Sequence, residues 1–439
     1  MSRAEARAIA ARLAEAGHQV VFAGGSVRDE LLGREPGDID IASSATPEQV
    51  MALFPQTVAV GRAFGVVKVI QQGREYDVAT FRRDVGGDDG RHPASVEPAS
   101  LELDVQRRDF TINGLVQDPF SGEVQDMVGG RADLEAGLVR AIGEPGQRFL
   151  EDGLRLLRGV RFAALFGFEL EPRTAAAMRE HAQRLQRVSG ERVRQELERM
   201  LVPPTRRRAL ELLDELGLLA VILPELSAMH GVEQPPQFHP EGDVWVHTCL
   251  VLESLPDEVS FELALGTLLH DVGKPPTFRR APDRIRFDGH VERGAEMAQE
   301  ICARLRLSRD TTRRVVALVA DHLIFMNVPS MRPARLRRLM AEAHFDELLT
   351  LYKADCAGCH GDTHALPVIE AMLAQLAEEA LVPPPLLTGA DVLALGVPPG
   401  PRVGALLNEA VDLQLEGQLP DRGRGLAWLA RRVAAQEGG

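Results

Sequence analysis

Two aspartates one residue apart, Asp38 and Asp40, follow a pair of adjacent glycines in the stretch "FAGGSVRDELLGREPGDIDIASS". In an extended strand, residues i and i+2 face the same side, so we expect the two carboxylates to project together. Two like charges so close are costly unless a cation binds between them, and Mg²⁺ prefers such oxygen ligands. The spacing therefore indicates a metal-binding pair, although the same pattern also occurs on ordinary exposed strands.

The glycines themselves, Gly24 and Gly25, follow one expected strand and precede a short expected helix. Glycine has no Cβ, so a ligand can approach the backbone closely, and the free N–H groups at a helix start favour anions. Arg28, one turn into that helix, adds a cation. Metal ions held by Asp38 and Asp40 could then align an attacking hydroxyl and neutralise the phosphates of a nucleoside triphosphate. The alternative is a plain strand–turn–helix–strand unit.

A second constellation of histidines and aspartates lies downstream, in "WVHT", "LLHDVGKPPTF", "FDGHVERGAE", "LVADHL" and "LYKADCAGCH". Imidazole and carboxylate ligands suit a divalent transition metal or Mg²⁺. Each histidine alone is better explained as a satisfied core or surface residue, but the set predicts a metal site, with His290 and His322 extending it to a second ion. Its residues are His247, His270, Asp271, His290, His322 and Asp355.

The segment "CAGCH" at 356–360 also fits the attachment pattern of c-type haem. Haem attachment requires export, and the N-terminal segment does not have the pattern of a signal peptide. A zinc site from Cys356 and Cys359 with His360 or His364 would lack a second ligand pair. Asp355, directly before this segment, explains the region better as the last ligand of the metal site.

These residues must be positioned by two kinds of structure. The first part of the chain alternates helix and strand patterns, with a glycine-containing hairpin turn between two strands and a polar, loop-like stretch at 82–102. From about residue 130 onward, helical periodicity dominates, with breaks at Pro203-Pro204 and at "LPELSAMHGVEQPPQFHPEGD". The pattern predicts a small α/β module followed by a nearly all-α remainder. The expected segments are a helix at 1–17, strands at 18–24, 38–42, 65–73 and 74–82, and helical runs at 149–168, 191–202, 244–380 and 388–439.

The composition is that of an ordinary globular protein, with 439 residues, 45% of them hydrophobic and 26% charged. This length predicts about two to four domains. No run approaches the roughly 18 apolar residues that cross a bilayer, so we expect no membrane partner and a cytoplasmic location. Four cysteines do not make a disulfide framework in a chain this long.

The net charge of −14 argues against a protein that coats nucleic acid without specificity. Arginines nevertheless cluster at 205–210, 304–314 and 332–338. Each cluster is either a solvated helix face or part of a basic surface. Nucleic-acid binding would need several of them on one side of the molecule.

Five motifs in the first half follow one another in a fixed order: "GGSVRD…GDIDIA", "EYDVATFR", "RRDFTINGL", "DMVGGRADLEAGLVRAIGEP" and "FLEDGLRLLRGVRFAALFGF". This series resembles the class II tRNA nucleotidyltransferase and bacterial poly(A) polymerase family of the polymerase-β superfamily. The resemblance implies a multi-domain α+β protein whose nucleotidyltransferase head has a small mixed sheet with helices. The expected segments are a head at 1–145, a helical neck and body at 146–235, an HD domain at 236–380 and a helical tail at 381–439.

The resemblance also implies roles for single residues. Asp38 and Asp40 match the metal pair, and Asp77 is a candidate third carboxylate acting on the primer hydroxyl, or else a surface residue at a strand end. Arg108, Asp109 and Asn113 match the element that reads the ribose, where a carboxylate can accept from the 2′-hydroxyl that distinguishes RNA from DNA.

Asp152 and Arg155, in "EDGLR", match the segment that recognises the incoming base. On a helix these two would share a face, and an acceptor beside a donor can mimic a Watson–Crick edge for C or A. In isolation the same letters would indicate a surface ion pair. Arg158 and Arg161 continue the helix and either contact the triphosphate or take part in packing.

The histidine and aspartate set, with its "HDVGKP" core, resembles the HD superfamily of metal-dependent phosphohydrolases. The two resemblances together imply Mg²⁺ at the transferase site and a divalent Mg, Mn, Ni or Fe ion at the HD site. Removing a 2′,3′-cyclic phosphate there would restore the hydroxyl that the head needs. The HD domain could also be an inactive scaffold.

The resemblance thus implies template-independent transfer of CMP and AMP from CTP and ATP to the 3′ end of tRNA, with pyrophosphate release. In the family that the chain resembles, CC-adding members have a shortened loop at this place, so the full length of the stretch 82–102 favours CCA or terminal-A addition over CC-only addition. The alternatives are an A-adding enzyme, a poly(A) polymerase, or an HD phosphohydrolase whose head binds RNA. A homodimer stays open.

Overall fold

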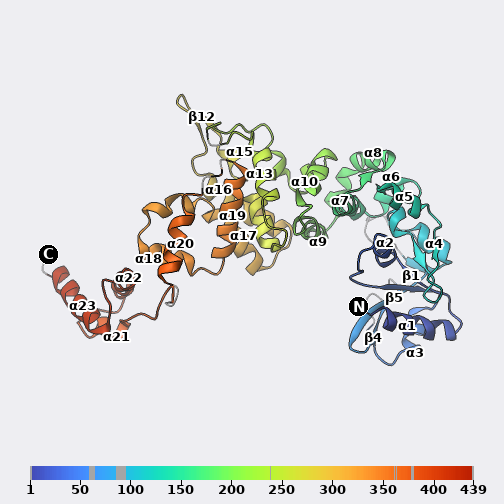
Figure 1. Cartoon of the computed structure of the whole chain (residues 1–439), viewed down its shortest axis with the longest axis horizontal. Helices are drawn as coiled ribbons and strands as arrows, with labels where there is room; N and C mark the ends of the chain where they lie inside the picture. The colour runs from blue at the N-terminus through green and yellow to red at the C-terminus, as the bar shows by residue number, and fades with distance from the viewer. Residues whose placement is uncertain are drawn as a thin grey trace. The chain divides into compact units, whose positions relative to one another are not determined.

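The computed structural model describes residues 2–58, 65–85, 95–237, 239–359, 361, 363–376 and 380–437. The chain divides into two compact units. Unit 1 comprises Met1–His230, Pro256–Phe261 and Glu300–Ser308, and unit 2 comprises Gly231–Leu255, Glu262–Gln299 and Arg309–Gly439. In Figure 1 the blue and green elements belong to unit 1 and most of the yellow to red elements belong to unit 2. The domain boundaries predicted near 145, 235 and 380 stay a prediction.

Unit 1 is built on a mixed seven-stranded sheet in the order β3-β4-β5-β2-β1-β8-β9. β2 lies between β1, with which it is antiparallel, and β5, with which it is parallel. The strand that begins at Asp40 therefore lies beside the strand that carries Asp77. The strands are β1 Val20–Ala23, β2 Asp40–Ser43, β3 Thr57–Val58, β4 Val66–Gln71, β5 Arg74–Thr80, β8 Val116–Gln117 and β9 Val124–Gln125.

The predicted hairpin is confirmed. β4 and β5 pair antiparallel from Val66↔Ala79 to Gln71↔Arg74. Gln72 and Gly73 form its two-residue turn with φ of 51° and 78°, the positive values that tight hairpin turns require. Glycine meets this requirement without strain, which explains the turn at this point of the sequence.

Helices cover the sheet and continue beyond it. The predicted first helix is confirmed as α1, which buries Ala6, Ile9, Ala10 and Leu13 at helical spacing against β1, β2 and α3. The helices around the sheet are α1 Arg3–Glu15, α2 Gly25–Leu31, α3 Pro47–Leu53, α4 Leu101–Gln106, the 3₁₀ helix η2 Thr111–Asn113 and α5 Gly130–Ala136.

The helical part of unit 1 begins at Pro145. A short parallel pair, β10 (Leu138–Val139) and β11 (Glu169–Leu170), ties it to the end of the sheet region. The predicted break at the two prolines is confirmed, because α9 ends at Leu201 and α10 begins at Arg206. Its helices are α6 Pro145–Glu151, α7 Leu154–Phe166, α8 Pro172–Glu180, η3 Ala182–Arg187, α9 Gly190–Leu201, α10 Arg206–Glu215, α11 Leu219–Ile222 and α12 Pro224–Ser227.

The stretch 82–102 was expected to be a loop, and at its ends this is wrong. β6 (Arg82–Val85) and β7 (Ser95–Pro98) pair antiparallel, and α4 begins at Leu101. The pairing is helped by an ion pair between Arg83 and Glu97 on the exposed face. Residues 86–94, which include the "GGDDGRH" portion, lie outside the described residues, so the inference drawn from the length of this segment stays a prediction.

Where the structure describes it, unit 2 consists of helices and their connections apart from one small hairpin, β12 (Arg279–Arg280) with β13 (Ile285–Arg286). Its last three helices form their own apolar cluster around Val392, Leu406 and Leu429. The helices that lie wholly or mainly in unit 2 are α13 Val244–Glu253, α14 Phe261–Leu269, α15 Lys274–Thr277, α16 His290–Arg304, α17 Arg309–Asp321, η4 Ile324–Ser330, α18 Pro333–Met340, α19 Phe345–Gly358, α20 Leu366–Gln375, α21 Gly389–Leu393, α22 Pro401–Leu415 and α23 Arg422–Glu437.

The predicted fold class is confirmed: a head with a small mixed sheet and helices, followed by helical segments. Within the described part of the chain, no helix combines the length and the apolar character needed to span a bilayer.

Candidate functional site

A cavity of about 460 Å³ in unit 1 gathers nearly all the residues expected to bind a nucleotide. They come from the β1–α2 turn, the start of β2, η2 and the α6–α7 region, more than a hundred residues apart in the chain. Asp77 is the one head candidate that does not line it. The lining residues are Gly24, Gly25, Arg28, Asp38, Asp40, Arg107, Arg108, Asp109, Asn113, Asp152, Leu154, Arg155, Arg158, Arg161, Phe162 and Arg192.

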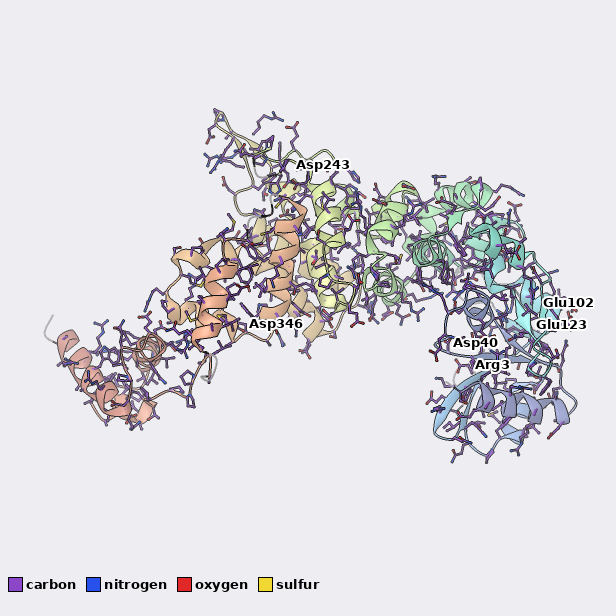
Figure 2. The ribbon with its side chains drawn as sticks, in the orientation of Figure 1. Arg3, Asp40, Glu102, Glu123, Asp243 and Asp346 are labelled. Carbon is purple, nitrogen blue, oxygen red and sulfur yellow. The ribbon has the colours of Figure 1, made fainter. Side chains whose placement is uncertain are left out.

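The carboxylate pair lies where β2 begins. Asp40 is the first residue of the strand, shown in Figure 2, whereas Asp38 precedes it, so the expectation that both lie within the strand is wrong. The alternation nevertheless holds, because Asp38 and Asp40 are exposed while Ile39 is 6% exposed. Burial of Ile39 in the core directs both carboxylates to the same cavity.

Gly24 lines the cavity close to Arg108 and Asp40. Its φ is +70°, and a Cβ at this position would lie 3.2 Å from Nη1 of Arg108 and 3.6 Å from Oδ2 of Asp40. A side chain here would be strained and would also fill the space between a cation and a carboxylate. The absence of a Cβ leaves this space to a ligand.

Asp40 carries an unusual charge environment. Desolvation by the surrounding protein, together with the negative charges of Asp38 and Asp77, raises the pKa of Asp40 to about 6. The positive charge of Arg108 acts in the opposite direction. Asp77 lies on β5, about half exposed, with Lys68 Nζ 3.9 Å from its Oδ1. A carboxylate whose ionisation is opposed by a neighbouring carboxylate forms, with that neighbour, a donor set that fits a divalent cation.

Asp109 lies at the centre of a buried polar chain. Its Oδ1 accepts from Nδ2 of Asn113 at 3.0 Å and from the backbone N–H of Phe110 at 2.8 Å. Its Oδ2 accepts from Nε of Arg158 at 2.6 Å, and Oδ1 of Asn113 accepts from Arg28. Burial alone would raise the pKa of Asp109, but the Arg158 charge and these hydrogen bonds lower it to about 2. The carboxylate is therefore ionised and held in place.

Asp152 and Arg155 line the same cavity, but the expectation that they share one helix face is wrong. Asp152 lies between α6 and α7 with extended backbone, φ −148° and ψ 107°. Its Oδ1 accepts from the N–H of Leu154 at 3.0 Å at the start of α7. The helical conformation is interrupted at Asp152, and Gly153, the next residue, packs so closely that a Cβ would lie 3.0 Å from the carbonyl oxygen of Arg184.

Each of these two side chains has its own partner. Arg192 of α9 donates to both oxygens of Asp152, from Nη2 at 2.8 Å and from Nη1 at 3.2 Å. Arg155 donates to Glu151 Oε2 at 2.6 Å and to the carbonyl oxygen of Arg107 at 2.8 Å. The acceptor and the donor are thus fixed separately at the cavity wall.

Phe162 is a shared platform for arginines of this cavity. The guanidinium carbon lies 5.1 Å from the ring centroid for Arg28, 5.3 Å for Arg158 and 4.2 Å for Arg161. Arg161 also donates to Oε2 of the buried Glu196 at 2.7 Å. The sequence left open whether Arg161 contacts the triphosphate or takes part in packing, and the structure shows it packed on Phe162 and paired with Glu196.

In unit 2, the predicted metal-ligating residues form two adjacent groups whose ligand atoms lie within 4.8 Å of one another. The first group is His247, His270 and Asp355. Nε2 of His247 lies 3.1 Å from Oδ1 of Asp355 and 3.4 Å from Nε2 of His270. The environment of these residues is strongly charged: burial would lower the pKa of His247, but Asp355, Glu241 and Asp271 raise it to about 9.

The second group is Asp271, His290 and His322. Oδ1 of Asp271 lies 3.9 Å from Nε2 of His290 and 3.8 Å from Nε2 of His322. Its Oδ2 lies 3.2 Å from Nε2 of His270 in the first group and 2.6 Å from Nζ of Lys274. The carboxylate of Asp271 therefore joins the two groups.

The histidine tautomers can be read from the hydrogen bonds. Nδ1 of His270, His290 and His322 lies 2.7, 2.8 and 2.8 Å from a backbone carbonyl oxygen three residues earlier. A carbonyl only accepts, so each Nδ1 carries a proton, and in the neutral ring Nε2 then keeps its lone pair. Among the described residues, Nε2 of His290 and of His322 has no hydrogen-bond partner although buried. Burial lowers the pKa of His322 to about 4, which keeps it neutral. These features fit metal ligands.

The alternatives at 356–360 receive no support from the geometry. Sγ of Cys359 donates to the carbonyl oxygen of Asp355 at 3.0 Å. In the part of the chain that the structure describes, none of the metal-ligand groups contains Cys356, Cys359 or His364. His360 lies outside the described residues.

Comparison with family models matches three regions of the chain. Residues 20–140 match the poly A polymerase head domain, and residues 244–356 match the HD domain. Between them, residues 167–229 match a model described as the probable RNA and SrmB-binding site of polymerase A. The three regions occur in the order expected from the sequence motifs.

Comparison with curated proteins covers nearly the whole chain. An A-adding tRNA nucleotidyltransferase of Deinococcus radiodurans is 34% identical over 415 residues, 90% of this chain and 91% of that protein. The chain belongs to the tRNA nucleotidyltransferase and poly(A) polymerase family. Within this family, a CCA-adding enzyme of Geobacillus stearothermophilus is 45% identical over 219 residues, 50% of this chain and 54% of the relative. The chain spans about half the length of the curated CCA-adding enzymes that it matches.

Among solved structures, a Bacillus stearothermophilus CCA-adding enzyme in complex with CTP resembles this family member along the whole chain. The TM-score is 0.77 with 29% sequence identity, and the match covers 99% of this chain and 98% of that one. The resemblance to the family inferred from the five motifs is confirmed.

Four cavity residues of this family member were not anticipated from its sequence: Arg107, Leu154, Phe162 and Arg192. Phe162 follows Arg158 by four residues on α7, so helical spacing could have placed it beside that arginine. Arg192 had no such signal, because it follows Asp152 by 40 residues.

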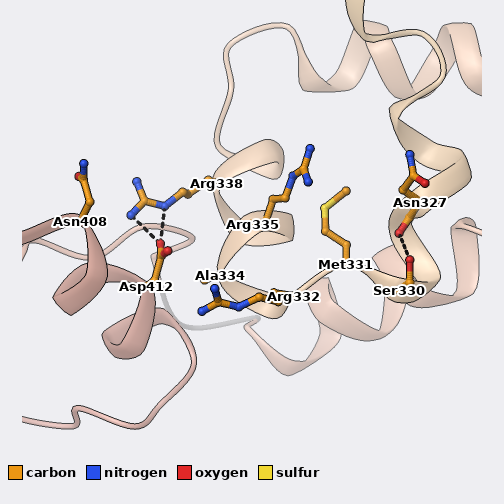
Figure 3. Close-up of a pocket in the computed structure, with 9 residues that line it drawn as sticks. All are labelled: Asn327, Ser330, Met331, Arg332, Ala334, Arg335, Arg338, Asn408 and Asp412. Carbon is orange, nitrogen blue, oxygen red and sulfur yellow. Dashed lines mark hydrogen bonds and ion pairs between the residues drawn. The ribbon is translucent and has the colours of Figure 1, made fainter. Parts of the chain in front are cut away.

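A second cavity, of about 710 Å³, lies in unit 2 along α18 and α22 (Figure 3). Arg332, Arg335 and Arg338 of the cluster at 332–338 line it. Arg338 donates to Asp412 at 2.8 Å, and Arg332 lies 2.7 Å from Glu416. Much of the positive charge is therefore neutralised within the protein.

Proposed function

We propose that this protein transfers CMP and AMP from CTP and ATP to the 3′ end of tRNA without a nucleic-acid template and releases pyrophosphate. The observation that carries this proposal is the cavity of unit 1, where a carboxylate pair, a buried ionised Asp109 and the separately held Asp152 and Arg155 line one space. The reacting hydroxyl, the sugar and the base could each contact a polar side chain of this cavity.

Asp38 and Asp40 would hold Mg²⁺, which supplies positive charge to the triphosphate and the attacking oxygen when bound. The raised pKa of Asp40 favours this assignment, because a cation relieves the repulsion from Asp38 and Asp77. Asp77 is proposed to act on the 3′-hydroxyl of the tRNA. Its charge acts on Asp40 even though it does not line the cavity.

The nucleotide would be oriented by the arginines and the Asp109 chain. Arg28, Arg108 and Arg158 supply positive charge for the phosphates, and Gly24 leaves the space beside Arg108 open. Asp109 would accept from a ribose hydroxyl through the acceptor capacity that remains beside its hydrogen bonds to Asn113 and Arg158.

Base choice would rest on Asp152 and Arg155. Cytosine and adenine both present an exocyclic amino donor beside a ring-nitrogen acceptor, whereas uracil and guanine present a carbonyl acceptor beside an N–H donor. A carboxylate acceptor with a guanidinium donor therefore favours CTP and ATP over UTP and GTP. Because these groups are protein side chains, no template is needed.

The direct test is incorporation of labelled CMP and AMP into tRNA that lacks its 3′ CCA. We expect both nucleotides to be added, in order, and no incorporation from UTP or GTP. Asp38→Asn and Asp40→Asn should each abolish transfer. Full activity of either variant would contradict the metal-pair assignment, and long A tails on unrelated RNA would contradict the tRNA-specific proposal.

A second candidate is addition of the terminal A alone. It is favoured by the relative from Deinococcus radiodurans, whose name is that of an A-adding enzyme and which matches over 90% of the chain. Transfer of AMP to tRNA ending in CC, with no CMP transfer to tRNA lacking CCA, would select this candidate over the first.

For unit 2 we propose a metal-dependent phosphohydrolase, with a divalent Mg, Mn, Ni or Fe ion at each of the two ligand groups. The support is the donor set itself, with two buried Nε2 atoms aimed at Asp271 without a hydrogen-bond partner. Metal content of the purified protein, compared with that of His270→Ala, tests the site. Equal metal content in both proteins would contradict it.

A further inference from the structure

Glu241, in the loop before α13, is a buried carboxylate for which neither the sequence motifs nor the proposed reactions provide a role. Its Oε1 lies 2.7 Å from Nδ1 of His247 and 2.9 Å from Nδ1 of His239. The side chain is 8% exposed. Glu241 therefore contacts a candidate metal ligand from the side opposite to the metal group.

His247 differs from the other three histidines of the site in how its ring is held. His270, His290 and His322 each use the carbonyl oxygen of their own helix or turn three residues earlier. His247 instead uses Glu241, which lies outside α13. Its orientation therefore depends on the loop rather than on its own helix.

The loop is itself fixed at both ends. Oδ2 of Asp243 accepts from the N–H of Gly231 at 2.6 Å, and its Oδ1 accepts from the N–H of Val246 at 2.9 Å at the start of α13 (Asp243 is labelled in Figure 2). The N–H of Val244 donates to the carbonyl oxygen of Val232 at 3.1 Å. Glu241 thus lies in a loop whose two ends are held together by hydrogen bonds.

A further contact ties the loop to the second ligand group. Oε1 of Gln234, which is 4% exposed, accepts from Nζ of Lys274 at 2.7 Å. The same Nζ lies 2.6 Å from Oδ2 of Asp271. The loop therefore contacts both groups, the first through His247 and the second through Lys274.

We propose that Glu241 is a positioning residue that holds Nδ1–H of His247 so that Nε2 presents its lone pair to the divalent cation shared with His270 and Asp355. A carboxylate bound to the far nitrogen of a ligating imidazole fixes the tautomer and the ring and raises the basicity of the ligand. His239 shares the carboxylate and restrains it from the other side. The inference rests on the metal site proposed above.

The test uses the full chain, freed of metal with a chelator and titrated with Co²⁺, whose visible spectrum reports imidazole ligation. His270→Ala supplies the blank for binding elsewhere. Glu241→Gln keeps an acceptor but removes the charge, and Glu241→Ala removes both. We expect Co²⁺ binding to weaken about 10- to 100-fold in Glu241→Gln and at least as much in Glu241→Ala, with a shifted visible band.

The matched control is Glu233→Gln in the same loop, whose carboxylate is 60% exposed and pairs with Arg280 on the surface. It should bind Co²⁺ like the unchanged protein. Nucleotidyl transfer by unit 1 checks that each variant is folded. If Glu241→Ala is not folded, Glu241→Gln decides.

The outcomes separate the two proposals. Wild-type affinity and spectrum in Glu241→Gln would overturn the positioning role while leaving the metal site intact. No difference between the unchanged protein and His270→Ala would instead overturn the metal site itself. Weakened binding with an unshifted spectrum would also contradict the inference, because the ligation of His247 would then be unchanged.

Discussion

Arg192 on α9 holds the carboxylate of Asp152, with Nη2 2.8 Å from Oδ2 and Nη1 3.2 Å from Oδ1. The two side chains are equally exposed, each at 23%, so the pair is accessible to a nucleotide yet partly shielded from water. The residue that we propose reads the base amino group is therefore oriented by a helix that follows it by 40 residues. Under this proposal, base choice depends on the packing of α9 as well as on α7.

Replacing Arg192 tests this relationship. In Arg192→Met, Asp152 keeps its place at the start of α7 but loses its charged partner, so its orientation toward the base should relax. We expect KM for CTP and ATP to rise about tenfold and discrimination against UTP to fall, as for loss of a charge-assisted hydrogen bond. Steady-state transfer assays with each nucleotide measure both effects.

Arg194→Met is the control for this change. Arg194 lies on the same helix and pairs with Glu198 in an i,i+4 ion pair at the surface. We expect its kinetics to stay near those of the unchanged protein. A loss as large as that of Arg192→Met would attribute the effect to α9 in general.

The pKa of Asp40 predicts a conflict between stability and function. A carboxyl whose pKa is raised from 3.8 to about 6 by folding binds its proton more tightly in the folded state. Its contribution to stability is fully present below about pH 3.8 and is lost as the pH rises through about 6. In metal-free protein at pH 7.5, Asp40→Asn should therefore raise the unfolding temperature while transfer is abolished.

Thermal unfolding with a chelator at pH 5 and pH 7.5 measures this effect. The gain in Asp40→Asn should be larger at pH 7.5 than at pH 5, because Asp40 is mostly protonated at the lower pH. Glu123→Gln, at an exposed position, is expected to change neither value. An equal gain at both pH values would show that ionisation of Asp40 is not the cause.

Phe162→Leu tests the arginine platform. Leucine keeps an apolar side chain in the core but removes the ring faced by Arg28, Arg158 and Arg161. We expect a loss of about 1–3 kcal/mol in unfolding free energy and a several-fold rise in KM for nucleotide, because the guanidinium groups lose a fixed partner.

Phe168→Leu provides the comparison for Phe162→Leu. Phe168 packs on Phe166, with ring centroids 5.6 Å apart, and does not line the nucleotide cavity. It should lose stability without a change in KM. If both variants show the same rise in KM, the platform does not act on the nucleotide site specifically.

Gly273→Ala tests the close packing behind the HD site. A Cβ on Gly273 would lie 2.0 Å from the carbonyl oxygen of His290 and 2.6 Å from the backbone nitrogen of Gly294, so α16 would have to shift. We expect unfolding to become easier by about 1–3 kcal/mol or more, with weaker metal binding because His290 is displaced. Calorimetry and metal titration measure the two effects.

Gly404→Ala, in α22, is the control, because nothing lies within 4 Å of its added Cβ. There alanine should stabilise by about 0.5–1 kcal/mol. Retention of full metal affinity in Gly273→Ala would contradict the inferred link between this packing and the ligand groups.

The periodicity of single elements gave reliable predictions. The i,i+2 spacing correctly placed the side chains of Asp38 and Asp40 together, on the face opposite to the buried Ile39. The spacing of Arg155, Arg158 and Arg161 on α7 was also correct. These relationships depend only on backbone geometry within a few residues, so the sequence is sufficient to predict them. For the same reason the hairpin of β4 and β5 followed from its turn residues.

Predictions that crossed the end of an element were less successful. Asp152 and Arg155 were expected on one helix, but the backbone of Asp152 is extended, and Gly153 beside it packs against the carbonyl oxygen of Arg184. The ends of the stretch 82–102 were expected as a loop and pair as strands, because each supplies the other's hydrogen bonds. In this second case, pairing with another segment outweighed the local preference.

The family, the order of the motifs and the residue types of both candidate sites followed from the sequence, because local spacing carries them. The fold was needed to show which side chains hold the candidate site residues: Arg192 for Asp152, Glu241 for His247, and Phe162 beneath three arginines. Ionic and hydrogen-bonding partners are selected by distance in space, which spacing along the sequence does not give. The folding of α9 and of the loop before α13 brings together residues that no periodicity connects.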